Sequence, residues 1–111
     1  MNLSGLWQSS DYECPAGVKH TERVQITQDG THISAVKTLG DDCVPTGHES
    51  FTGTVTGNSG KVQYWGAQPG SQPTLSSSQD NLVILDANTF TASGTAIVET
   101  ILRYTRVTTA N

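Results

Sequence analysis

The chain has 111 residues and a formal net charge of −4, from six basic and ten acidic residues. Its length suits one domain that buries roughly two thirds of its unfolded surface without a metal or partner. Hydrophobic residues make up 34% of it and charged residues only 14%, which excludes a charge-rich disordered chain. No cluster of basic residues could bind nucleic acid, and no apolar run approaches the ~20 residues that span a bilayer. We therefore expect a single domain over residues 1–111 that binds neither nucleic acid nor membranes.

Apolar and polar residues alternate through most of the chain, a period that predicts β-strands. Tight-turn signals occur at Asp29-Gly30, at 57–60 and at 86–88, and longer polar connections lie between the other strands. The predicted strands are 3–9, 20–28, 31–39, 48–56, 61–66, 81–85, 89–93 and 99–107, with a short strand near 74–75. This pattern indicates an all-β fold, a single antiparallel up-and-down barrel of about eight strands. Because tight and long connections alternate, the long loops should gather at one end and form a mouth.

A two-residue turn at Asp29-Gly30 sets the pairing of the strands on either side of it. The opposed pairs would be Ile26–Ile33, Val24–Ala35, Glu22–Lys37 and His20–Leu39. Since the first two pairs are apolar, they point into the barrel. Alternation then places Glu22, Lys37 and His20 on the same inward side, nearer the mouth.

The second hairpin predicts a similar inward face. Its opposed pairs would be Val55–Val62, Gly53–Tyr64 and Phe51–Gly66, with Tyr64 filling the space above Gly53. The candidate ligand-binding residues are therefore His20, Glu22, Lys37, Phe51 and Tyr64. A buried ion pair costs desolvation and seldom stabilises better than an apolar pair would, so its position favours ligand recognition. A structural ion pair at the barrel rim is the equally open alternative.

The stretch 35–51, AVKTLGDDCVPTGHESF, resembles the K-x-T-G-D-x-x-V-P-x-G-x-x-T/S-F segment of the lipocalin-like domain in cyclin-binding F-box proteins and plastid EXECUTER proteins. Their preceding H-G-x-E element is similar to His20-Thr21-Glu22, which is one residue shorter, and Leu39 interrupts the T-G step. The resemblance covers residues 20–51 and implies a lipocalin-like, calycin-type barrel whose mouth is a recognition surface, which in the F-box relatives receives a peptide. The F-box is not among the matched residues, so a ubiquitin-pathway role does not carry over. In the loop, the Asp41 carboxylate is placed to accept hydrogen bonds from nearby amides, and a structural and a ligand-binding role for it are equally open.

Gly5-Leu6-Trp7 also resembles the lipocalin G-x-W opening, in which an arginine of the last strand packs on the tryptophan. Arg103 and Arg106 are the two arginines available for that contact. The simpler interpretation is a tryptophan that serves only the core.

Cys14 and Cys43 lie just beyond the same end of the first predicted hairpin, since its register places residue 14 opposite about residue 45. We therefore predict a disulfide between them, with two reduced core thiols as the alternative. A bridge would favour an oxidising compartment such as the periplasm or the extracellular space. Without it, the sequence specifies no location.

The sequence carries no cofactor motif, no nucleophile elbow and no closely spaced metal-ligand pair. Only His20 and His48 could approach each other, with Glu22, Glu49 or Cys43, so we expect no metal and no cofactor.

We expect the mouth to bind a small molecule or a short peptide, and no pattern specifies an oligomeric state. One alternative is a small barrel enzyme of the isomerase, cyclase or lyase type, using Glu22 and Lys37 in acid–base catalysis. Another is an interaction module with a filled barrel. A cavity of ~300 Å³ or more would favour a ligand site over the filled barrel.

Overall fold

The protein is described by a computed structural model that covers residues 2–14, 17–41, 43–67, 70–94 and 101–107. Within these ranges it is all β, and it holds no helix long and apolar enough to cross a membrane. Its strands are β1 (Gly5–Ser9), β2 (Tyr12–Glu13), β3 (Lys19–His20), β4 (Arg23–Asp29), β5 (His32–Leu39), β6 (Glu49–Thr56), β7 (Ser59–Gly66), β8 (Thr74–Leu75), β9 (Asp80–Asp86), β10 (Thr89–Ser93) and β11 (Ile101–Arg106).

Eight of the strands close into an antiparallel up-and-down barrel, as the sequence predicts. Around the barrel the order is β1, β4, β5, β6, β7, β9, β10 and β11, and β11 pairs again with β1. Neighbouring strands in this circuit are joined along the chain without crossovers. The short β8 adds to the outer part of β7, and β2 pairs only with β3. Closure leaves none of the eight barrel strands with a free edge.

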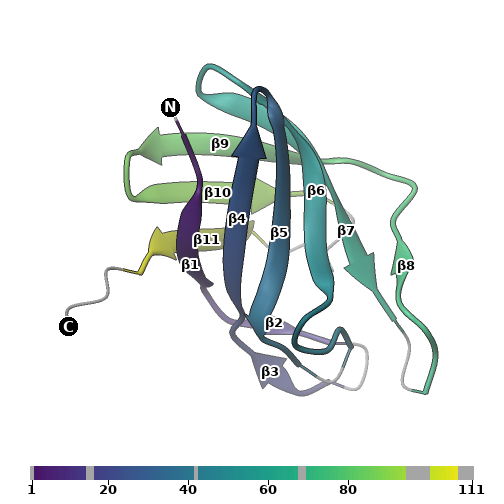
Figure 1. The fold of residues 1–111 in the computed structure, drawn as a ribbon. Coiled ribbons are helices and arrows are strands. Elements are labelled where there is room, and N and C mark those ends of the chain that lie inside the picture. The colour runs from purple at the N-terminus through teal and green to yellow at the C-terminus, as the bar shows by residue number, and fades with distance from the viewer. Residues whose placement is uncertain (1, 15–16, 42, 68–69, 95–100, 108–111) are drawn as a thin grey trace.

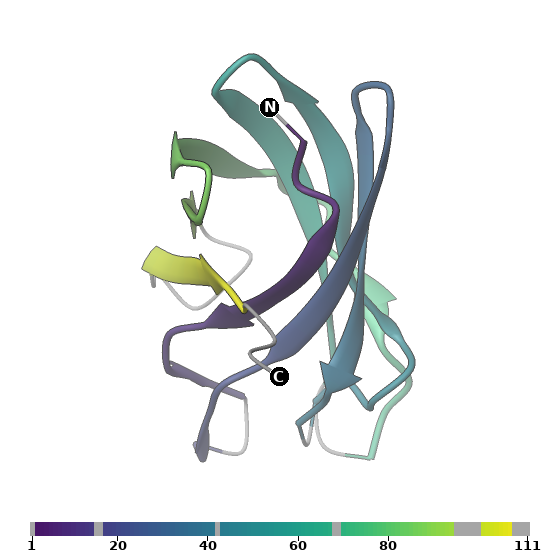
Figure 2. The same ribbon diagram turned by 60° about the vertical axis from the view of Figure 1, so that its left-hand side comes forward.

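The two ends of the barrel differ in their connections. The tight turns that join β4 to β5 and β6 to β7 lie together at the top of Figure 1, near the N-terminus. The β2–β3 arm and the connection from β5 to β6 lie at the opposite end, and β8 lies beside the end of β7 (Figures 1 and 2). The loop-rich end expected from the alternation of short and long connections is therefore present.

The β4–β5 hairpin differs from its predicted register by two residues. Asp29 pairs with His32, so Gly30 and Thr31 form the turn, and Ile26 lies opposite Ala35 rather than Ile33. The reason is that Gly30, at φ 61°, supplies the left-handed conformation at the first turn position instead of the second. Because the shift is even, every side chain keeps its predicted face.

The β6–β7 hairpin is shifted by two residues in the same way. Gly57, at φ 62°, and Asn58 form the turn, so Phe51 lies opposite Tyr64 and Gly53 lies opposite Val62. The predicted placements of Tyr64 over Gly53 and of Phe51 opposite Gly66 are therefore wrong. An even shift again leaves the inward and outward faces as predicted.

The first long connection holds structure that the alternation did not predict. Residues 10–19 were expected to form a loop, but β2 and β3 make a short hairpin there, and Tyr12 pairs with His20. The predicted pairing of His20 with Leu39 is wrong, because β4 begins only at Arg23 and a bulge follows it. Residues 99 and 100 of the predicted last strand lie outside the described residues.

The barrel interior is filled by side chains. Trp7, Phe51, Phe90 and Tyr104 are fully buried and pack ring against ring, with Phe90 stacked on Tyr104 at 4.7 Å between centroids. Aliphatic residues from β4, β5, β6, β7, β9, β10 and β11, together with Leu3 ahead of β1, complete this core. Aromatic packing of this kind favours one rigid arrangement. The core occupies the tight-turn half and the middle of the barrel, so polar side chains gather near the mouth.

Candidate functional site

Glu22 is the centre of a buried polar network at the mouth end of the barrel. It lies just before β4, and its side chain is only 2% exposed. Its carboxylate accepts hydrogen bonds from Ser50 Oγ at 2.7 Å and from the Tyr104 hydroxyl at 2.5 Å. Lys37 Nζ lies 2.8 Å from the same group, so three donors converge on it.

Lys37 joins Glu22 to a second carboxylate. Its ammonium lies 2.7 Å from Asp41 Oδ2 and donates to the Tyr12 hydroxyl at 3.1 Å, so all three of its protons have acceptors. The predicted Glu22–Lys37 contact is therefore made. It is made through the side chains, because the backbone partner of Lys37 is Val24.

Asp41 holds the β5–β6 connection in shape. Its Oδ1 accepts hydrogen bonds from the amides of Cys43 and Val44 at 2.9 and 2.7 Å. Its Oδ2 accepts hydrogen bonds from Lys37 Nζ and from the Tyr12 hydroxyl. Burial raises the pKa of this carboxyl, but the hydrogen bonds from Lys37, Tyr12 and Val44 outweigh burial. The pKa therefore lies below its ordinary value of 3.8.

Three tyrosines surround the network and stay neutral. Burial is the main cause that raises the pKa of Tyr12, Tyr64 and Tyr104 above the ordinary value of 10, and the nearby Glu22 carboxylate raises each further. The Tyr64 hydroxyl hydrogen-bonds that of Tyr104 at 2.9 Å, which extends the network to the far wall of the mouth.

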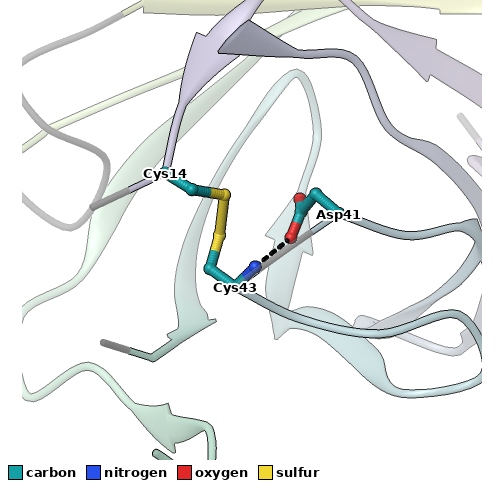
Figure 3. Close-up of side chains that lie close together, drawn as sticks. All are labelled: Cys14, Asp41 and Cys43. Atoms are coloured by element: carbon teal, nitrogen blue, oxygen red, sulfur yellow. Dashed lines mark hydrogen bonds between the residues drawn. A yellow bond between two sulfur atoms is a disulfide. The ribbon is translucent and has the colours of Figure 1, made fainter. Parts of the chain in front are cut away.

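The predicted Cys14–Cys43 disulfide is present, with 5.8 Å between the Cα atoms. It ties the end of β2 to the β5–β6 connection, and Asp41 lies beside it with its carboxylate turned to the Cys43 amide (Figure 3). Cys14, Cys43 and Asp41 are the one group of three potential metal ligands among the described residues. Both sulfurs are used by the bridge and both carboxylate oxygens by hydrogen bonds, so this oxidised arrangement offers a cation no ligand atom.

A cavity of about 130 Å³ opens at the mouth above this network. Its walls include Tyr12 and Glu13 of β2, the buried Glu22 and Lys37, and Tyr64 of β7. Asp41, Cys43, Val44, Ser50, Trp65, Gly66, Ala67 and Leu102 complete them. The volume is well below the ~300 Å³ at which sites for drug-sized ligands begin. It is close to the ~150 Å³ of an engineered protein cavity that binds benzene. By the volume expected to separate the two alternatives, the interior therefore agrees with a largely filled barrel. The cavity at its mouth can take one ring-sized group, not a whole drug-sized molecule.

Of the five predicted ligand-binding residues, three line the cavity: Glu22, Lys37 and Tyr64. Phe51 is fully buried beneath them and packs on Tyr64 at 4.9 Å between ring centroids. His20 is half-buried beside the Tyr12 ring and is not part of the lining. Among the described residues, His20 and His48 do not belong to a group of potential metal ligands. His48 instead packs on the ring of Trp65.

The prediction missed Tyr12, Ser50 and Tyr104. Tyr12 lies in a segment taken as loop, and a two-residue strand has no periodicity to reveal it. Tyr104 could have been found, because it alternates with the buried Leu102 on the last predicted strand.

Trp7 and Arg106 make the contact expected from the G-x-W pattern. The guanidinium carbon lies 4.4 Å from the centre of the Trp7 ring. Its nitrogens donate to the carbonyls of Asn2, Ser4 and Ala87 at 2.8 to 3.2 Å. Arg106 therefore caps the core at the end opposite the mouth, while Arg103 is exposed on the outer face.

No protein-family model, curated protein or solved structure matches the chain.

Proposed function

We propose that this barrel binds a small molecule or a short peptide at its loop-rich mouth, with one group of the ligand inserted into the cavity. The observation that carries the proposal is the 130 Å³ cavity itself, because it lies where the filled core ends and the polar network begins. An apolar wall beside a few fixed polar groups is the usual make-up of a ligand site. The remainder of such a ligand would lie across the surrounding loops.

The rigidity of the walls supports the same proposal. Tyr12, Lys37 and Asp41 hold one another, and the disulfide fixes the β2–β3 arm against the β5–β6 connection. A preorganised site loses less conformational entropy when it binds. These contacts therefore support a role of the mouth in ligand recognition.

The same contacts argue against acid–base catalysis by Glu22 and Lys37. A general base needs a lone pair within reach of the substrate, and a general acid needs a free proton. Glu22 already accepts three hydrogen bonds, and each Lys37 proton already has an acceptor. We therefore assign the pair to shaping the site and setting its charge.

We also propose that the chain is a small member of the lipocalin-like barrels. The support is the closed eight-stranded meander together with Arg106 over Trp7, which follows the G-x-W pattern of the first strand. The bound peptide of the F-box relatives is compatible with a mouth that takes one inserted group.

The proposal is tested by blocking the cavity. Gly66 lies on its wall with open space around the position of a Cβ, so Gly66→Leu is chosen to obstruct the opening. Ligands selected from a displayed library of short peptides and a fragment set should bind Gly66→Leu at least about tenfold more weakly. Thr56→Leu, an exposed position at the tight-turn end, is the matched control and should bind unchanged. Ligands that bind both variants as they bind the parent would overturn the proposal.

A further inference from the structure

The walls of the mouth cavity carry more negative than positive charge. Glu22 and Asp41 are two buried carboxylates that share the single ammonium of Lys37. Glu13 adds a third carboxylate to the lining and is exposed at the rim. Lys19, its neighbour across β2–β3, is not part of the lining. A cavity with this charge balance attracts cations, and its low-dielectric walls strengthen the field.

The two buried carboxylates of the lining already accept hydrogen bonds. Asp41 receives four hydrogen bonds, and Glu22 receives three. A primary ammonium or a guanidinium that passes Glu13 at the rim and reaches the two buried carboxylates would lose its hydration and find few lone pairs there, which is costly. A quaternary ammonium has no N–H to satisfy, so it keeps the attraction without that cost.

The aromatic and apolar part of the lining suits the same ligand. Tyr12 and Tyr64 both line the cavity, and Val44 and Leu102 complete an apolar wall. Aromatic rings beside acidic groups are a recurrent way of recognising methylated ammonium groups, since the ring quadrupole attracts a desolvated cation. The two rings stay neutral at physiological pH, because their pKa values are raised by burial.

We propose that the group inserted at the mouth is a quaternary ammonium, such as a trimethylammonium on a small molecule or on a peptide side chain. This inference rests on the proposed function and names the ligand class of the same cavity. The volume of about 130 Å³ agrees with it, because a trimethylammonium is similar in size to the benzene that a ~150 Å³ cavity holds.

The test compares choline with its uncharged carbon isostere, 3,3-dimethylbutan-1-ol. The two differ in charge and hardly in shape, so their affinities separate the cation from the apolar group. Ligand-observed saturation-transfer NMR on the whole protein should show choline binding at least about tenfold more tightly. Its affinity should also fall as salt is added, because screening weakens the field of the rim charge.

Two charge variants locate the effect. Glu13→Gln removes the exposed rim carboxylate without touching the buried network, and should weaken choline about threefold at low salt while leaving the isostere unchanged. Asp29→Asn removes an exposed carboxylate at the tight-turn end and should change neither ligand. Equal affinity for the two ligands would overturn the ammonium assignment and leave the proposed mouth site standing. Binding of the isostere alone would also overturn it. Binding of neither ligand would overturn the ammonium assignment alone, because the mouth site is tested separately by the selected ligands and Gly66→Leu.

Discussion

Replacing Lys37 by methionine should destabilise the barrel severely, because it leaves two buried carboxylates without their cation. The side chain is 4% exposed, and its ammonium lies 2.8 Å from Glu22 and 2.7 Å from Asp41. Breaking a buried ion pair by removing one partner costs ~3–5 kcal/mol. Total stabilities of domains this size are ~5–15 kcal/mol, so the loss is a large fraction. At roughly 4 °C per kcal/mol, the melting temperature should fall by ~12–20 °C.

Thermal melts followed by circular dichroism measure this loss, and a second variant shows its cause. The double variant Glu22→Gln/Lys37→Met should recover part of the loss, since it leaves one carboxylate, Asp41, without its cation instead of two.

Lys61→Met is the matched control for that experiment. Lys61 is exposed and donates to Asn81 on the outer face, so its loss should stay within ~0.5 kcal/mol. A deficit of Lys37→Met below ~1 kcal/mol would refute the reasoning, because that is the size of a solvated surface pair.

Three further predictions concern the contacts around the mouth and the opposite end. Removing the disulfide with Cys14→Ser/Cys43→Ser should cost roughly 3–4 kcal/mol for its separation of 29 residues, and a melting temperature unchanged by reductant in the parent would contradict this. Arg106→Lys should cost ~1–2 kcal/mol in chemical denaturation and change the fluorescence of Trp7, because lysine lacks the planar fork that reaches three carbonyls; an unaltered protein would argue against the cap. Asp41 has a lowered pKa, so its contribution to stability is fully present above pH 3.8, the ordinary pKa of the carboxyl, and is lost as the pH falls below that value. Asp41→Asn should therefore be less stable than the parent at pH 7 but lose less on acidification, and parallel pH profiles would count against its hydrogen bonds.

The faces of the strands were predictable from the sequence, whereas their exact pairing was not. Both hairpin turns use glycine at the first turn position, where Asp29-Gly30 suggested the second. Moving a two-residue turn by one position along the chain shifts the pairing by two residues. An even shift keeps each side chain on its face, so the alternation that placed Glu22 and Lys37 inward was unaffected.

The rest of the site depended on contacts that no local pattern encodes. Tyr12 reaches Lys37 and Asp41 because the β2–β3 hairpin, with two residues in each strand, and the disulfide hold it at the mouth. Tyr104 meets Glu22 across 82 positions of the chain. Side-chain networks of this kind follow from closure of the barrel, which periodicity alone cannot position.

The chain's own amides give the most direct test of where it binds. Two-dimensional amide NMR of the labelled protein, titrated with the tightest peptide or fragment, should show the largest shifts at Cys43, Val44 and Ala67 around the mouth. The turns at Gly30 and Gly57 should not move. Shifts centred on those turns, or on the outer face of β1 and β11, would contradict the assignment of the mouth as the binding site.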